Sequence, residues 1–175
     1  MPCIERQAFV PYSPQAMFDL VAAVERYPQF LPWCASSQIL LRRDDGIDAS
    51  LQVRFKGIQQ HFSTRNIHRP PGLIQMQLLD GPFERLEGAW HFDGISASDN
   101  HGLNDDCGPT SDSSLRGDSA HKHDQGCLQG TKVRLRLDYE MKSGLLAKLF
   151  APAFDMIAAQ MMDAFLARAD QCYGV

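Results

Sequence analysis

Apolar residues recur at steps of three and four along the stretch from Ser143 to Tyr173. This spacing places them on one face of a long helix, with charged and amide side chains on the other. Pro152 is expected to kink or restart that helix, because proline lacks a backbone N–H. The apolar positions are Leu146, Leu149, Phe150, Ala153, Phe154, Ile157, Met161, Phe165 and Ala169. The rest of the chain must therefore cover a wide apolar surface.

Most of the preceding chain alternates between apolar and polar residues, which is the period of a strand with one buried face. The alternation predicts strands at residues 4–10, 39–43, 47–55, 59–69, 73–79, 83–93 and 131–141. A single early helix is expected to begin at Pro14, with Ser13 as its cap, and to end near Arg26. The predicted fold class is α+β: a curved antiparallel sheet of about seven strands wrapped around the long C-terminal helix.

Between the last two strands, residues 96–130 are rich in Ser, Asp, Gly and His and contain almost no large apolar residue. Such a segment cannot bury enough surface to offset its ordering entropy, so we interpret it as a disordered polar insertion in a single domain of residues 1–175. The alternative is a metal site, formed by His101, Cys107, His121, His123 and Cys127. Their spacing matches no closed zinc pattern, so no metal ligand is predicted.

Charge and cysteine usage narrow the class of protein further. The insertion carries six aspartates against two basic residues, and outside it acidic and basic residues are equal in number. A neutral folded part gives no case for DNA binding. An odd number of cysteines without paired spacing fits a reducing compartment. With no apolar run of about 18 residues and no signal-peptide pattern, we expect a cytoplasmic protein, peripheral at the inner membrane at most.

Motifs of catalysis are missing from the sequence. It contains no GxGxxG, GxxxxGK[ST], GxSxG or HExxH pattern. We therefore predict that the protein is not an enzyme and needs no cofactor, and a cyclase or hydrolase is the weakest of three interpretations. The large amount of aromatic and methionine content instead suggests a cavity between sheet and helix. Ligand pockets of this kind commonly measure about 300–1,000 Å³ and have mainly apolar linings, so a lipid is the expected occupant.

Specific motifs then carry a family resemblance. They are Val10-Pro11-Tyr12-Ser13, the rigid apolar turn Tyr27-Pro28-Gln29-Phe30-Leu31-Pro32-Trp33-Cys34, Asp80-Gly81-Pro82-Phe83, the strand Leu86-x-Gly88-x-Trp90-x-Phe92, and the helix from Phe154 to Ala169. In these the chain resembles the START-like (helix-grip, SRPBCC) superfamily. Within it, the resemblance is to the branch that joins the mitochondrial coenzyme Q-binding proteins to the bacterial ribosome association toxins of the RatA type.

The resemblance implies a hydrophobic tunnel that holds ubiquinone or another polyprenyl lipid, in support of respiration. The residues expected to line the tunnel are Phe30, Leu31, Trp33, Phe55, Met76, Trp90, Tyr139, Phe150, Phe154, Ile157 and Met161. Each of them is also explained by ordinary core packing. If exposed, the turn at residues 28–32 would touch a membrane surface while the ligand passes.

The resemblance equally implies the alternative function, a toxin of a toxin–antitoxin pair that binds the large ribosomal subunit and blocks subunit joining. Such a protein needs a surface for RNA phosphates or a ribosomal protein. Lys132, Arg134 and Arg136 are predicted to point outward from the last strand and would supply it, with Arg54, Lys56 and Arg65 close by. Outward basic residues of this kind also simply promote solubility.

Overall fold

The strands and helices lie close to the segments that the sequence predicts. The computed structural model describes residues 3–96 and 128–174. Within these ranges the strands are β1 (Cys3–Val10), β2 (Cys34–Arg43), β3 (Gly46–Phe55), β4 (Ile58–Arg69), β5 (Leu73–Asp80), β6 (Phe83–Ser96) and β7 (Leu128–Met141). The helices of the same ranges are α1 (Pro14–Ala22), the 3₁₀ helix η1 (Val24–Gln29) and α2 (Leu145–Tyr173).

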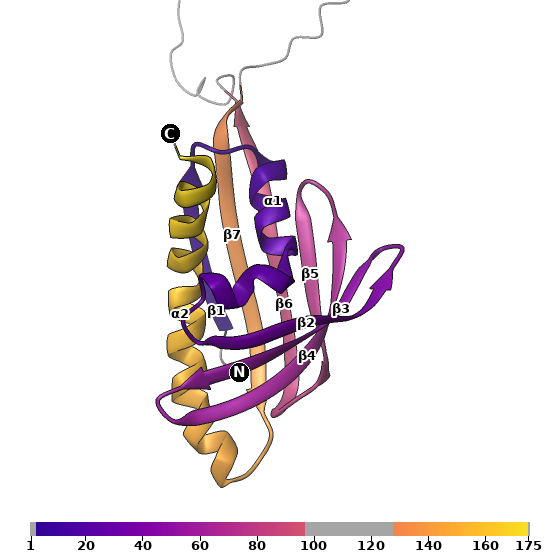
Figure 1. Ribbon diagram of the computed structural model, residues 1–175, viewed down its shortest axis with the longest axis vertical. Helices are drawn as coiled ribbons and strands as arrows, with labels where there is room; N and C mark the ends of the chain where they lie inside the picture. Colours follow the sequence, from indigo (N-terminus) through magenta and orange to yellow (C-terminus); the bar gives the residue numbers. More distant parts are fainter. Residues whose placement is uncertain (1–2, 97–127, 175) are drawn as a thin grey trace, which may run out of the picture.

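All seven strands of the described residues form one antiparallel sheet, in the order β1-β7-β6-β5-β4-β3-β2. The pairing of β1 with β7, from Cys3 opposite Asp138 to Val10 opposite Thr131, brings the first strand beside the last. In Figure 1 the strands β2, β3 and β4 run across the molecule while β6 and β7 run along its length, and α2 lies beside β1 and β7. The predicted helix-grip architecture is confirmed.

The early helix is shorter than predicted. Ser13 caps it as expected, since its hydroxyl accepts a hydrogen bond from the Ala16 N–H at 3.1 Å. However, α1 ends at Ala22, and η1 follows instead of a continuation to Arg26. Pro28 has no N–H to donate to the Val24 carbonyl, which accepts a hydrogen bond from the Ser37 hydroxyl at 2.7 Å instead.

Strand β2 begins five residues earlier than the sequence suggests, at Cys34 instead of Ile39. It is an edge strand that pairs only with β3, and its register shifts between Cys34 and Ser36 and again between Ile39 and Leu41. Each irregularity displaces the alternation of side chains. The first residues of β2 therefore lack the regular apolar–polar alternation that predicts a strand.

The boundaries of the predicted insertion also change. Strands β6 and β7 remain paired out to Ile95 opposite Gly130 and Ser96 opposite Leu128. Ser96 and residues 128–130 thus belong to strands, because backbone pairing continues beyond the regular alternation of apolar and polar residues. The remainder of the segment predicted to be disordered lies outside the described residues, as do the five candidate metal ligands.

Helix α2 runs without interruption through Pro152, so it does not restart there. Pro152 cannot donate a hydrogen bond to the Lys148 carbonyl, but Lys148 is exposed, so water can hydrogen-bond to that carbonyl instead. Leu149, predicted on the buried face, is 55% exposed. The buried face instead consists of Phe150, Ala153, Phe154, Ile157, Ala158, Met162, Phe165 and Ala169.

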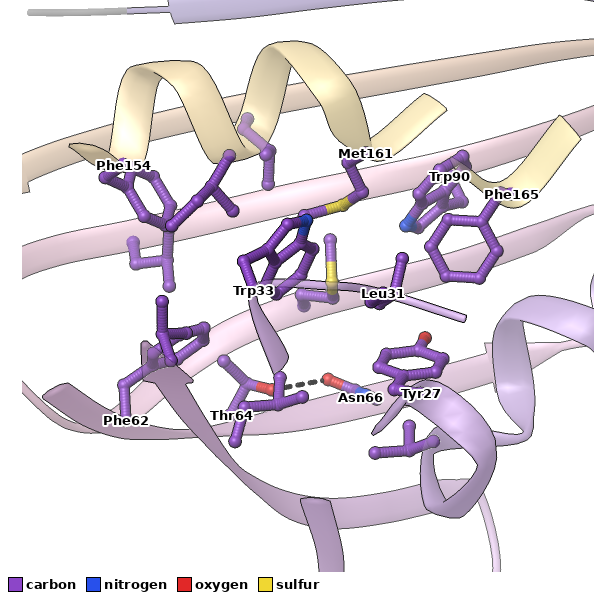
Figure 2. Close-up of a pocket in the computed structure, with 17 residues that line it drawn as sticks. Tyr27, Leu31, Trp33, Phe62, Thr64, Asn66, Trp90, Phe154, Met161 and Phe165 are labelled. Atoms are coloured by element: carbon purple, nitrogen blue, oxygen red, sulfur yellow. Dashed lines mark hydrogen bonds between the residues drawn. The ribbon is translucent and has the colours of Figure 1, made fainter. Parts of the chain in front are cut away.

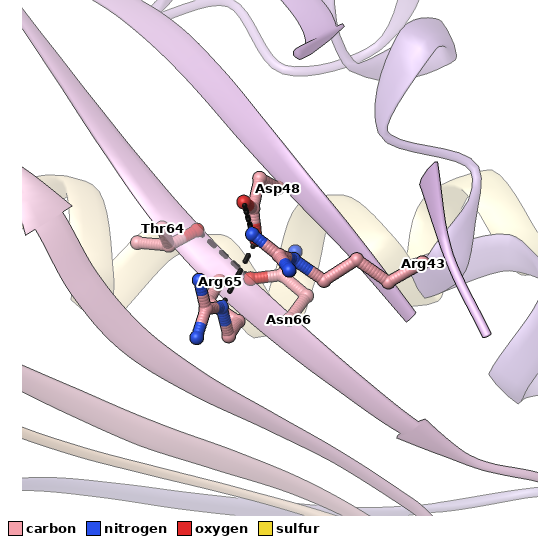
Figure 3. A network of polar contacts seen from close by, with 5 residues as sticks. All are labelled: Arg43, Asp48, Thr64, Arg65 and Asn66. Carbon is pink, nitrogen blue, oxygen red and sulfur yellow. Dashed lines mark hydrogen bonds and ion pairs between the residues drawn. The ribbon is translucent and has the colours of Figure 1, made fainter. Parts of the chain in front are cut away.

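On the outer face of the sheet, Asp48 holds together the strands at the β2 edge (Figure 3). Its carboxylate accepts hydrogen bonds from Arg43 at 2.6 and 3.0 Å and from Arg65 at 3.2 Å. The hydrogen bond from Arg43 lowers the pKa of Asp48, with a further contribution from Arg65. Asp48 therefore stays ionised and joins β2, β3 and β4 through one buried carboxylate.

Candidate functional site

A partly enclosed apolar cavity lies between α2 and the inner face of the sheet (Figure 2). Its walls come from η1, from the turn before β2, from strands β3 to β7 and from α2. The lining residues are Val24, Tyr27, Leu31, Trp33, Leu51, Val53, Phe62, Thr64, Asn66, Met76, Leu86, Trp90, Leu137, Phe154, Ile157, Met161 and Phe165. Elements distant in the sequence thus converge on one apolar space.

The cavity is much smaller than the sequence predicts. Its volume is about 50 Å³, against the roughly 300–1,000 Å³ of typical small-molecule sites. Side chains of the lining fill the remaining space. At Gly88 on β6, a Cβ atom would lie only 2.5 Å from Leu137 Cδ2 and 2.7 Å from Met76 Cε. The expectation of an open tunnel is therefore wrong for this conformation, because the side-chain ends of Leu137 and Met76 pack against the bare backbone of Gly88.

The structure places most of the predicted ligand-binding residues on the wall of this cavity. These are Leu31, Trp33, Met76, Trp90, Phe154, Ile157 and Met161. Phe30, Phe55, Tyr139 and Phe150 do not line it. Whether any of the eleven contacts a ligand stays a prediction.

The four others have different positions in the core or at its edge. Phe150 packs on Phe83, with ring centroids 6.2 Å apart. Tyr139 is buried, and its hydroxyl donates a hydrogen bond to Asp155 of α2. Phe55 is half-buried at the end of β3.

Phe30 is half-buried at the other end of the site, between helix α2 and solvent. Its ring lies 5.2 Å from Phe165, and the Arg168 guanidinium sits 5.5 Å from its centroid. Pro28 and Pro32 in the same turn are exposed, whereas Leu31 and Trp33 point inward. The turn therefore has a buried side that faces the cavity and an exposed side that carries the two prolines.

Sequence reasoning missed ten of the lining residues. The inward positions of β3 and β4 (Leu51, Val53, Phe62, Thr64 and Asn66) could have been found from strand alternation, because alternate residues share one face. Thr64 and Asn66 are polar, so their residue types alone predict them on the outer face of the sheet and not in the cavity. Phe165 is on the predicted buried face of α2 but was assigned to the core alone.

The polar groups of the cavity are few and neutral. The Thr64 hydroxyl donates a hydrogen bond to the Asn66 side-chain oxygen at 2.8 Å, and both residues are buried. The Tyr27 hydroxyl donates to the Val21 carbonyl at 2.5 Å, and burial raises the pKa of Tyr27 well above its usual value. Tyr27 is thus held as a neutral phenol that is already hydrogen-bonded.

The predicted basic residues do lie on the outer face of β7, but the two arginines are paired with carboxylates. Arg134 donates to the Asp93 carboxylate at 2.7 and 3.1 Å. Arg136 donates to Asp138 at 2.9 Å and lies 3.4 Å from the Glu5 carboxylate. Both arginines are therefore engaged by neighbouring carboxylates.

Lys132 differs, because its ammonium group lies 5.7 Å from the centroid of the exposed Phe9 ring. The other basic residues that the sequence grouped with these three are not neighbours. Arg54 and Arg65 belong to β3 and β4, and Lys56 to the turn between them, and β6 and β5 separate β7 from β4. The six positions do not form one surface.

Metal binding and membrane insertion are two further functions on which the described residues bear. Among residues 3–96 and 128–174, no three His, Cys, Asp or Glu side chains come together as a metal site would require. Residues Lys148–Tyr173 of α2 are long enough and apolar enough to cross a membrane, with a mean hydropathy of 1.3. However, one face of α2 is buried in the core of the domain. A core helix of this length can be as apolar as a membrane-spanning helix, so its length and hydropathy alone do not indicate a membrane span.

An antiparallel sheet curved around one long C-terminal helix defines the helix-grip fold of the START-like superfamily. The sequence profile of the family described as polyketide cyclase / dehydrase and lipid transport matches residues 10–166. The chain belongs to this family.

Individual relatives show which members of the family this chain is similar to. The ribosome association toxin RatA of Pseudomonas aeruginosa is 34% identical over 171 residues, which cover 98% of this chain and 97% of the toxin. COQ10 homolog B, a mitochondrial coenzyme Q-binding protein of Xenopus laevis, is 27% identical over 93% of this chain and 56% of its own. The Zhui aromatase/cyclase of a Streptomyces species superposes with a TM-score of 0.71 at 13% identity, covering 99% of both chains, which shows the fold alone.

Proposed function

We propose that this chain is a non-enzymatic protein that binds ubiquinone or a similar polyprenyl lipid in support of respiration. The observation that carries the proposal is the apolar cavity between α2 and the sheet, walled by aromatic, aliphatic and methionine side chains. The name of the coenzyme Q-binding relative agrees with such a ligand. Removal from water could contribute roughly 3–4 kcal/mol for each five-carbon isoprenyl unit, so a tail needs no polar chemistry to be held.

A ligand of that size requires the cavity to widen. Met76 and Met161 are half-buried lining residues with unbranched, flexible side chains. Methionine adapts to irregular spaces at little cost, because it has three rotatable bonds and no branch. Rotation of these two side chains is the first step that we propose for ligand entry.

The chemistry of the lining supports binding in preference to catalysis. Among the described residues that line the cavity there is no carboxylate, imidazole, ammonium or guanidinium group. A cyclase-like enzyme needs a positioned acid or base, and the one phenol present is already hydrogen-bonded. A cyclase therefore remains the weakest of the three candidate functions.

Extraction of the natively purified protein tests this function directly. We expect organic solvent to release a polyprenyl quinone in near-stoichiometric amount, identified by its mass and by its redox-difference ultraviolet spectrum. A protein that yields no such lipid and takes up no added quinone would contradict the proposal.

The second candidate is ribosome binding, and the observation that favours it is the 34% identity to a ribosome association toxin over nearly the whole chain. The outer face of β7 would provide contacts through Lys132, Arg134 and Arg136. Because the two arginines are paired with carboxylates, phosphate binding there would have to displace those partners. Exposed ion pairs of this kind contribute only about 0.2–1 kcal/mol each. Several phosphate contacts could therefore offset the loss of these ion pairs.

Charge reversal distinguishes this candidate. If it holds, replacing Lys132, Arg134 and Arg136 by glutamate should abolish co-sedimentation with the large ribosomal subunit and relieve any growth defect on overexpression. The matched control reverses Arg54 and Lys56, which are exposed at the far end of β3. Equal co-sedimentation of both variants and wild type would exclude the β7 surface as the contact.

A further inference from the structure

The indole N–H of Trp33 is a buried donor without an acceptor. The Trp33 side chain is 3% exposed, and its Nε1 atom has no hydrogen-bond partner in the part of the chain that the structure describes. Figure 2 shows the ring among the lining residues, with its nitrogen on the side of Met161. Buried polar groups nearly always have a partner, so an orphaned donor on a cavity wall needs an explanation.

Backbone hydrogen bonds hold the turn that carries Trp33. In the turn before β2, the Leu31 N–H donates to the Tyr27 carbonyl at 2.8 Å, and the Cys34 N–H donates to the Leu31 carbonyl at 3.0 Å. The Arg54 N–H of β3 donates to the Trp33 carbonyl at 2.8 Å. These bonds hold the backbone of the turn in place, and the Trp33 side chain lies buried on the cavity wall.

Asn66 on β4 adds a second source of donors on the same cavity. Its side-chain oxygen already accepts the hydrogen bond from Thr64, an arrangement that Figure 2 shows as a dashed line. That bond uses the amide oxygen and leaves the two N–H groups of Asn66 available as donors. The free polar atoms of Trp33 and Asn66 are therefore hydrogen-bond donors.

We infer that Trp33 and Asn66, from two walls of the cavity, donate hydrogen bonds to the carbonyl oxygens of the ligand's headgroup. This inference rests on the proposed lipid-binding function and specifies its ligand class: an apolar molecule that carries carbonyl acceptors, as a quinone ring does. A carboxylate headgroup would need a cation, and none of the described lining residues provides one. An alcohol headgroup would bring its own O–H, which would compete for the few acceptors that the cavity contains.

The test compares two ligands on the full chain. One is a ubiquinone analogue with a ten-carbon tail, and the other is a benzene ring of similar substitution and tail that lacks the carbonyl oxygens. Trp33→Phe keeps an aromatic ring but removes the N–H, and it should weaken binding of the quinone roughly tenfold, the effect of one hydrogen bond. It should weaken binding of the ligand without carbonyl oxygens much less, as measured by calorimetry.

Infrared spectroscopy supplies a readout that a packing role would not move. In the wild-type protein the carbonyl stretch of bound quinone should lie below its position in hexane, and Trp33→Phe or Asn66→Ala should return it toward that position. An unshifted stretch in the wild type, or equal losses for both ligands, would overturn the inference while leaving lipid binding intact. If the wild type binds neither ligand, the proposed function itself fails.

Discussion

Replacing Phe154 by alanine is expected to lower the free energy of unfolding by about 3–5 kcal/mol. Phe154 is 3% exposed and connects α2 to the sheet. Its ring centroid lies 4.8 Å from those of Phe83 and Tyr139, and 6.5 Å from that of Phe62. Truncation would remove these contacts and leave a void between rigid rings that cannot collapse fully. Urea denaturation followed by circular dichroism measures the change.

The matched control is Leu149→Ala on the same helix. Leu149 is 55% exposed, so its truncation should change the free energy of unfolding by no more than about 0.5 kcal/mol. Similar small effects for the two variants would mean that α2 is not held by this aromatic cluster. Such a result would contradict the packing that defines the site.

The architecture could be predicted because its periodicities are long and regular. In β7 the buried residues Val133, Leu135, Leu137 and Tyr139 alternate with exposed or half-buried charged ones, and in α2 the steps of three and four span eight turns of helix. Each pattern repeats often enough to determine the element and most of its buried face, with Leu149 as an exception. A regular strand and a long amphipathic helix leave few ways to pack.

Boundaries set by hydrogen bonding could not be predicted in the same way. Helix α1 ends where the backbone of Ala23 leaves the helical region, and the carbonyl of Val24 just beyond it accepts a hydrogen bond from Ser37, thirteen residues further along the chain. The start of β2 depends on pairing with β3 across two irregularities. Neither feature leaves a signal in the hydrophobic pattern, because both arise from backbone groups that meet only after folding.

The candidate site was predicted in part for a related reason. Bulky residues on inward faces, such as Trp90 and Ile157, identify the walls, and periodicity locates them. Thr64 and Asn66 occupy inward positions of β4 but look like surface residues in the sequence. The size of the cavity depends on where the ends of Leu137 and Met76 come to rest beside Gly88, which is a packing result that composition does not determine.

Met161→Trp is expected to reduce the quinone bound per protein at least tenfold. Met161 lines the cavity from α2, and an indole in its place would occupy space that the ligand must take. The helix should stay docked, because overpacking at a half-buried position costs typically about 1–3 kcal/mol, which thermal unfolding would register. Bound quinone is measured by solvent extraction and mass spectrometry.

Met156→Trp is the matched control, since the same change is made on the same helix. Met156 is 38% exposed and does not line the cavity, so this variant should retain the wild-type quinone content. Because both variants add one indole to α2, a general effect of tryptophan on the helix would lower both contents alike. Loss in Met161→Trp alone places the ligand between α2 and the sheet. Undiminished quinone in both variants would place it elsewhere, and would remove the cavity as the reason for the proposed function.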